Sequence, residues 1–305
     1  MTLPFDLRLP VVAAPMFLVS GPALVIAACR AGIVGSFPTT NCRTAAEVDA
    51  WMSEIAAAID GAPWAANLIT HSTNARLADD LALVARHKPP LVITALGSPA
   101  PVIDIVHAYG GIVLADVIDV RLAQKALAAG ADGLACVAAG AGGHTGTLSP
   151  LAFVAAIRGF FDGPVALGGG IADGAGIAAA IAAGADLIYM GTRFVAATES
   201  MAAPGYKAML ADAGIADIVV SKAVTGTAAS WLRASFDAAG YTIDDGAPLR
   251  DYNSAGDGAA RWRDIWSAGQ GVHAIAGETS TAEIVADLDR GFRAASARLA
   301  GWPAR

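Results

Sequence analysis

The sequence contains AAGADGL at residues 128–134 and AAGADLI at residues 182–188, 54 positions later. Each copy has the pattern of a helix end, a glycine that stops the helix and the first residues of a strand. A spacing of this length fits two strand–helix units, so the copies are expected at equivalent places in a repeating βα structure. Asp132 and Asp186 stand at the starts of the two strands, and we expect each of them to have a structural role.

On both sides of this repeat, apolar runs of strand length alternate with alanine-rich helical stretches such as 44–59, 74–87 and 120–129. The runs lack period-2 alternation, as expected for parallel strands that are covered on both faces. Eight such units in about 200 residues favour a closed (β/α)8 TIM barrel, with an open doubly wound sheet as the alternative. The expected strands are residues 11–16, 33–37, 64–69, 91–96, 112–115, 133–137, 164–167 and 187–190.

The pattern changes after the eighth run. Residues 201–213 and 221–239 have the composition of helices, and residues 240–258 are polar and rich in turn formers. A last helix is expected over residues 281–300, where apolar side chains recur at helical spacing. We therefore expect a barrel domain built from residues 1–204 and 266–305, and a small helical lid subdomain over residues 205–265.

Composition excludes several classes of protein. The chain is 55% hydrophobic and 15% charged, which indicates a thick buried core rather than disorder. Its formal net charge of −7 argues against nucleic acid as a partner. No apolar run approaches the roughly 20 residues of a spanning helix, and the N-terminus lacks a secretory pattern, so a cytoplasmic protein is expected. Neither the three cysteines nor the histidines have metal-ligand spacing.

Glycines gather where the last two predicted strands end. The seventh strand runs into Gly168-Gly169-Gly170 and the eighth into Gly191-Thr192. TIM barrels often bind phosphate at these two strand ends, because bare amides and a helix N-terminus favour an anion. The sequence therefore predicts a phosphate site, although three successive glycines are also compatible with tight packing.

Other polar and soft side chains follow other strands. Ala14, Pro15 and Met16 end the first strand, and Asn67 lies in the third. With a phosphate site they would form a cup for a flat heteroaromatic ring, unless Met16 is an ordinary core residue. The glycine-rich stretch at residues 138–146 places one titratable side chain, His144, after the sixth strand. It is either part of a site or a turn with a solvent-exposed histidine.

Together these motifs resemble the nitronate monooxygenases, a family of FMN-dependent enzymes related to FMN-dependent enoyl reductases and quinone reductases. The resemblance is carried by Ala14-Pro15-Met16, Asn67, the stretch GAGGHTG at 140–146, GGGIAD at 168–173 and GTRF at 191–194, and it extends over nearly the whole chain. It implies a TIM barrel with FMN at the carboxyl ends of the strands and a helical second domain.

The resemblance also assigns roles to residues. It implies His144 as the catalytic group beside the flavin and phosphate contacts from Gly169, Gly170, Gly191 and Thr192. Well-known members carry a lysine near the end of the fifth strand, where this chain has Asp116; a carboxylate there opposes the anionic reduced flavin unless it is protonated or turned away. The expected cofactor-binding residues are Ala14, Pro15, Met16, Asn67, Asp116, Gly142, Gly143, Gly168, Gly169, Gly170, Gly191 and Thr192.

Three functions remain open from the sequence. The first is oxidation of an alkyl nitronate by O2 to a carbonyl compound and nitrite, with His144 as base or as hydrogen-bond donor to the nitro group. The second keeps FMN but uses NAD(P)H to reduce a quinone or an enoyl thioester. The third is a flavin-binding barrel without turnover. In each case the expected partner is a small molecule, with neither metal nor membrane, and a homodimer is left open.

Overall fold

Eight parallel strands close into a barrel in the computed structural model, which describes residues 4–243, 245–247 and 263–302. Every predicted strand is present, and the TIM barrel prediction is confirmed. The closed order also rules out the open doubly wound sheet. The strands, in barrel order, are β1 (Val11–Ala13), β2 (Val34–Pro38), β3 (Trp64–Ile69), β4 (Leu91–Ala95), β5 (Ile112–Val117), β6 (Gly133–Val137), β8 (Val165–Gly168) and β9 (Leu187–Met190).

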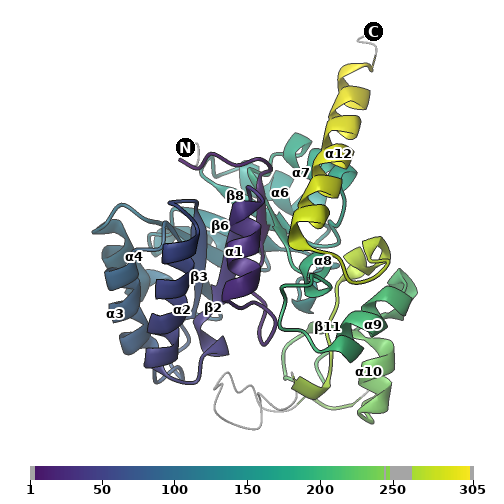
Figure 1. The fold of residues 1–305 in the computed structure, drawn as a ribbon, viewed down its shortest axis with the longest axis horizontal. Coiled ribbons are helices and arrows are strands. Elements are labelled where there is room, and N and C mark those ends of the chain that lie inside the picture. Colours follow the sequence, from purple (N-terminus) through teal and green to yellow (C-terminus); the bar gives the residue numbers. More distant parts are fainter. Residues whose placement is uncertain (1–3, 244, 248–262, 303–305) are drawn as a thin grey trace.

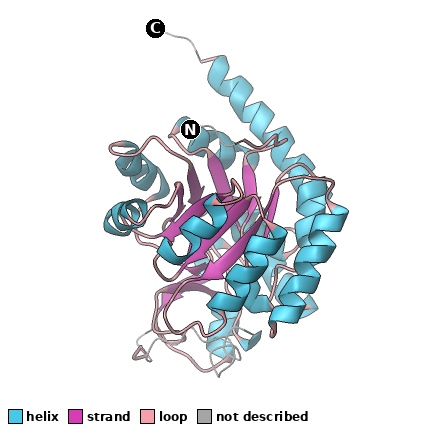
Figure 2. Cartoon of the chain, turned by 90° about the vertical axis from the view of Figure 1, so that its left-hand side faces the viewer, coloured by secondary structure: helices cyan, strands magenta, loops and turns pink. Residues whose placement is uncertain are grey.

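Helices surround the barrel, as Figure 2 shows with the strands at the centre. Side chains such as Val12, Ile93 and Leu114 fill the interior, and larger apolar clusters lie between strands and helices. Both faces of each strand are therefore buried, which explains the continuous apolar runs. The surrounding helices are α1 (Pro22–Arg30), α2 (Ala45–Ala58), α3 (Leu77–His87), α4 (Ala100–His107), α5 (Val120–Ala128), α6 (Pro150–Arg158), α7 (Gly174–Ala182) and α8 (Thr192–Val195), with a 3-10 turn at Thr39–Asn41.

The repeated sequence has the same structure in both copies. Asp132 accepts a hydrogen bond from the backbone N–H of Val113 at 2.8 Å, and Asp186 accepts one from Val165 N–H, also at 2.8 Å. Each aspartate thus ties the start of its own strand to the start of the preceding one. The two carboxylates lie at the amino ends of the strands, away from the loops that could form a site, as the sequence predicted.

The chain after the barrel differs in part from its prediction. The expected helix near 201–213 is α9 (Pro204–Asp212), but 221–239 is not one helix: it contains β11 (Ala229–Leu232) and then α10 (Arg233–Ala238). β11 lies between β10 (Ile218–Ser221) and β7 (Gly143–His144) in an antiparallel sheet. Long-range pairing overrides the helical composition of this segment. The subdomain boundaries at 205 and 265 stay a prediction, and residues 244 and 248–262 lie outside the described part.

The C-terminal helix returns to the barrel. α12 (Thr281–Ala300) occupies the predicted residues and packs on α7, with its free end projecting from the molecule (Figure 1). It begins with a capping box in which Ser280 and Glu283 accept from each other's backbone N–H groups. Arg8, before β1, bonds Asp289 of α12 at 2.9 Å and ties the two ends of the chain together. Two 3-10 segments, Ile215–Asp217 and Gln270–Ala274, complete the described elements.

Candidate active site

One cavity of about 1150 Å³ opens at the carboxyl ends of the barrel strands. All thirteen site residues expected from the sequence line it, together with further residues of the loops after β1, β4, β5, β6, β8 and β9. Ligand pockets commonly measure about 300–1,000 Å³, so this one is large enough for a cofactor and a substrate together. The structure thus brings the predicted residues together, while their individual roles stay predictions.

Hydrogen bonds join the glycine-rich loops into one wall. The carbonyl of Gly140 accepts from the N–H groups of Gly170 at 3.1 Å and Gln270 at 2.9 Å. Thr192 Oγ1 accepts from Gly269 N–H at 2.9 Å. Four segments that are distant in sequence therefore meet here, including residues 269–270, which the sequence had not predicted to lie in the site.

Close backbone approach explains why this wall is rich in glycine. A Cβ on Gly142 would lie 2.7 Å from the backbone nitrogen of Gly269 and 2.9 Å from Thr192 Oγ1. Gly170 has φ +67°, a conformation that residues with a side chain rarely adopt. The tight-packing interpretation of these glycines is thus partly right, and it is compatible with a site because the packing is what aligns the loops.

Three amides of the same wall are free of protein acceptors within the described part of the chain. The backbone N–H groups of Gly169, Gly191 and Thr192 donate to no acceptor among the described residues. Thr192 is the first residue of the short helix α8, whose first N–H groups have no partner within the helix. Polar hydrogens grouped at two neighbouring strand ends form an environment that favours an anion.

His144 is held on a different wall by the small antiparallel sheet. It pairs with Ala229 of β11, and the next residue, Thr145, donates from its N–H to the Ala228 carbonyl at 3.1 Å. Thr145 Oγ1 also donates to Ala138 O at 3.2 Å. Two residues of the glycine-rich stretch, Gly143 and His144, therefore form a strand, and His144 is half-buried, which is against the alternative of a turn with a solvent-exposed histidine.

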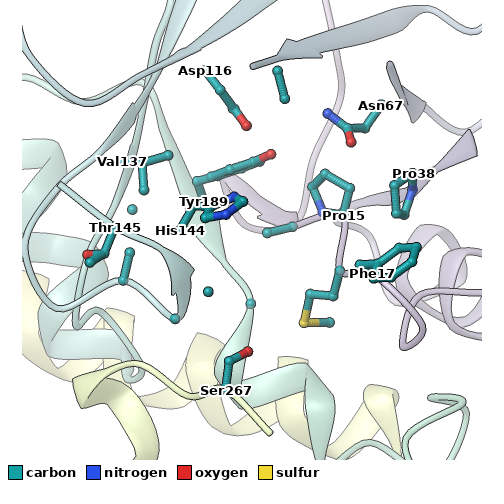
Figure 3. A pocket seen from close by; sticks show the side chains of 18 of the residues that line it. Pro15, Phe17, Pro38, Asn67, Asp116, Val137, His144, Thr145, Tyr189 and Ser267 are labelled. Carbon is teal, nitrogen blue, oxygen red and sulfur yellow. The ribbon is translucent and has the colours of Figure 1, made fainter. Parts of the chain in front are cut away.

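Figure 3 shows the polar ends of Asn67, Asp116 and Tyr189 directed into the cavity, with the His144 ring. Asn67 is buried and donates from Nδ2 to Ile93 O at 3.1 Å, which fixes its amide. Tyr189 was not predicted as a site residue, because it lies inside an apolar run that has the pattern of a core strand.

Asp116 of β5 and Tyr189 of β9 are neighbours at the barrel mouth and influence each other's pKa. Burial raises the pKa of Asp116 to about 7, against the lowering effect of the neighbouring Tyr189 hydroxyl. Burial and the neighbouring carboxylate raise the pKa of Tyr189 well above its usual value, so its hydroxyl stays protonated. The second carboxylate oxygen, Oδ1, is buried without a hydrogen-bond partner among the described residues. At neutral pH a large fraction of Asp116 is therefore uncharged, and protonation is one of the two ways, besides turning away, in which a carboxyl group can be accommodated beside a reduced flavin.

The loop after β1 is positioned by Asn41, another residue that the sequence did not reveal. Asn41 Oδ1 accepts from Leu18 N–H at 2.7 Å, and its Nδ2 donates to the carbonyls of Met16 and Ser20 at 3.1 and 2.7 Å. Leu18 has φ +60°, which is unusual for leucine. Met16 lies against Gly191, 3.4 Å from where a Cβ would be, and lines the cavity instead of being buried in the core.

Two aromatic rings close the side of the cavity near α9. Tyr206 and Trp266 stack with their centroids 5.3 Å apart, and the Tyr206 hydroxyl donates to Ser267 O. Within the described ranges there is no group of His, Cys, Asp and Glu side chains that could hold a metal ion. The same part of the chain has no helix that is long and apolar enough to cross a membrane.

Comparison with known proteins gives concordant matches. A family model described as nitronate monooxygenase matches residues 71–291. A nitronate monooxygenase of Paraburkholderia phytofirmans is 32% identical, with 92% of this chain and 91% of that protein aligned. The (3aS,4S,5R,7aS)-5-hydroxy-7a-methyl-1-oxo-octahydro-1H-indene-4-carboxyl-CoA dehydrogenase of Rhodococcus jostii is 30% identical over 71% of this chain and 60% of its own length. The structure of nitroalkane oxidase from Streptomyces ansochromogenes superposes with a TM-score of 0.82 and 26% identity, covering 95% of this chain and 97% of that one.

Proposed function

Because the chain belongs to the nitronate monooxygenase family, we propose that its cavity binds FMN and that the enzyme oxidises alkyl nitronates with O2. The family is one of flavin-dependent oxidoreductases, so the chain is an enzyme of this class. The proposal that the enzyme binds FMN and oxidises nitronates rests on one observation: the amides of two neighbouring strand ends and the His144 ring line one cavity.

The residues present fit FMN. The N–H groups of Gly169, Gly191 and Thr192, which lack protein acceptors among the described residues, would bind the phosphate. Asn67 and Met16 would contact the ring, and Asp116 would face it as a carboxyl group that is about half neutral at pH 7 and increasingly neutral below it. When bound, FMN supplies the electron transfer between the substrate and O2.

The chain's own residues then bind and orient the substrate. A nitronate would lie between Met16 and His144, with its negatively charged nitro oxygens within reach of the imidazole. For a neutral nitroalkane, His144 would remove the α-proton, which general-base catalysis accelerates by about 10²–10⁴-fold. In the overall reaction two nitronate ions and one O2 give two carbonyl compounds and two nitrite ions, which balances atoms and charge.

A second candidate function is reduction or oxidation of an acyl thioester. It is favoured by the relative from Rhodococcus jostii, whose name specifies a carboxyl-CoA dehydrogenase, and by a cavity that is larger than FMN and a small nitronate need. In this case NAD(P)H or the thioester would exchange electrons with the flavin.

Anaerobic mixing tests the proposal. The visible spectrum of the purified protein should contain flavin bands, and propyl-2-nitronate added without O2 should bleach them while NADH should not. Admission of O2 should restore the bands and release nitrite. Bleaching by NADH alone would favour the second candidate, and a protein that is colourless and stays so after incubation with FMN would contradict both.

A further inference from the structure

The cavity continues outward from the barrel mouth beyond the residues discussed so far. It is lined on one side by the loop after β4, residues 96–99, and on the other by the loop after β5 and the first turns of α5, residues 118–126. We call this part the lateral arm. β4 and β5 are neighbours in the barrel and are separated by other strands from β8 and β9, whose ends carry the candidate phosphate turns. The arm therefore leads away from the proposed phosphate site.

The walls of the lateral arm are mainly apolar. Leu96, Pro99, Leu122 and Ala126 contribute to them, and Ile118 keeps 39% of its surface exposed. Leu96 has φ +61°, so the loop after β4 has an unusual backbone conformation at this point. A nitronate of a few atoms leaves such a space unfilled. An apolar channel open to solvent fits an elongated molecule whose middle section is a flexible chain.

Two cations lie in the arm. Arg121 and Lys125 are four residues apart on α5, so they lie on one face of the helix, and both line the cavity. Neither forms an ion pair with any described residue, although the chain as a whole has a net charge of −7. The acid within the arm is Asp119, which caps α5 by accepting from Leu122 N–H at 2.7 Å. Because the carboxylate of Asp119 faces the first amides of α5, the electrostatic potential around Arg121 and Lys125 stays positive.

We propose that the lateral arm binds the phosphate-bearing nucleotide end of a long second substrate, whose reactive end reaches the cavity near His144. Arginine and lysine one helical turn apart match a polyanion such as a diphosphate better than a single carboxylate. Two kinds of molecule carry this chemistry: coenzyme A thioesters and nicotinamide nucleotides. The inference rests on the proposed oxidoreductase function and extends its substrate range.

Binding to the flavin-containing protein tests this inference without turnover. Isothermal titration calorimetry measures the binding of free coenzyme A and, separately, of NADP+. Pantetheine is a third probe, which lacks the nucleotide. The test variant is Arg121→Ser/Lys125→Ser. Arg43→Ser/Arg298→Ser is the matched control, since it removes the same charge from exposed positions that do not line the cavity.

We expect at least one nucleotide to bind, and to lose affinity about tenfold, or about 1.4 kcal/mol, in the test variant but not in the control. Its affinity for the wild-type protein should also fall as salt rises from 50 to 500 mM, which checks the electrostatic contribution even if a variant folds poorly. Any affinity for pantetheine should be the same in all three proteins. The nucleotide that binds, coenzyme A or NADP+, identifies which of the two kinds of molecule the lateral arm takes. Absence of binding by both nucleotides, or equal affinity in test and control variants, overturns the inference.

Failure of the inference can be told apart from failure of the proposed function. If nitronate bleaches the flavin and no nucleotide binds, only the lateral-arm inference is wrong. If a nucleotide binds through Arg121 and Lys125 and nitronate has no effect on the spectrum, the nitronate proposal is wrong and the arm's ligand identifies the substrate class.

Discussion

The hydroxyl of Tyr189 on β9 lies beside the carboxyl group of Asp116 on β5, at the mouth of the barrel, and lowers the pKa that burial raises. This pair places a group with a pKa of about 7 in the wall of the candidate active site. Perturbed carboxyl groups in clefts are concentrated at functional sites, because burial that is unfavourable for the charged form is retained only where it serves a purpose. The pair is therefore a candidate functional element of the site.

Replacing Asp116 with asparagine should stabilise the protein at high pH and not at low pH. Because the folded pKa, about 7, exceeds the ordinary 3.8, the folded state keeps a proton that the unfolded state releases. The contribution of this proton to the free energy of unfolding is fully present below pH 3.8. It is lost as the pH rises from 3.8 through about 7. Asp116→Asn should thus raise the free energy of unfolding by roughly 1–4 kcal/mol at pH 8, and by much less at pH 5.

Urea unfolding at both pH values measures this difference. Asp212→Asn, on α9 and outside the cavity, is a control with the same chemical change. A stabilisation that is equal at pH 5 and pH 8 would show that the charge of Asp116 is not responsible.

Replacing His144 with alanine separates its two proposed roles. If His144 is the base, the variant should oxidise neutral 2-nitropropane about 10²–10⁴-fold more slowly, while oxidation of the preformed nitronate changes much less. Equal losses on both substrates would instead identify a hydrogen bond to the nitro oxygens. The measurement is stopped-flow flavin reduction. His87→Ala, which removes a histidine that pairs with Asp49 at a distance from the site, is the control. Unchanged rates on both substrates would contradict any catalytic role.

The barrel was predictable from the sequence because each of its strands is buried on both faces and carries a local apolar signal. The glycine clusters were also informative, since close approach at Gly142 and the positive φ of Gly170 leave little choice of residue. β11 could not be predicted in this way. It is defined by pairing between residues such as Ala229 and His144, 85 positions apart, and its own residues do not have a strong strand pattern.

Tyr189, which lines the cavity, and Asn41, which positions the loop after β1, were missed for a related reason. Tyr189 is one polar group in an apolar strand, and its role depends on a partner, Asp116, on another strand. Asn41 lies after β2 but acts on the loop after β1. In both cases the chemistry arises from a tertiary contact, which a search for local motifs does not detect.

A methyl group at Gly142 should separate the loops that form the glycine-rich wall. In Gly142→Ala, the new Cβ would lie 2.7 Å from the backbone nitrogen of Gly269, which must move away from Thr192 Oγ1. We expect at least tenfold weaker flavin binding and a loss of stability of about 1–3 kcal/mol, as for other overpacked sites. Flavin fluorescence titration and urea unfolding measure the two effects. Gly246→Ala, whose Cβ would meet open space, should leave both unchanged.

Asn41 provides the last test, because one side chain makes three hydrogen bonds to the loop that carries Met16. Asn41→Ala removes all three and leaves the half-buried N–H of Leu18 without its acceptor, while the Met16 carbonyl still accepts from the N–H groups of Val19 and Ser20, so it should destabilise the protein by about 1–3 kcal/mol. Asn41→Asp keeps an acceptor for Leu18 N–H but cannot donate to the carbonyls of Met16 and Ser20. It should therefore place a carboxylate against these two oxygens and destabilise the protein as well.

The larger effect on function should be on the substrate. Met16 would border the substrate as well as the flavin ring, whereas the phosphate would bind at Gly169 and Gly191, so both Asn41 variants should raise the KM for nitronate more than they raise the dissociation constant of the flavin. Steady-state nitrite release and flavin titration compare the two constants. A variant that loses flavin and keeps its KM would place the loop after β1 on the cofactor instead of on the substrate.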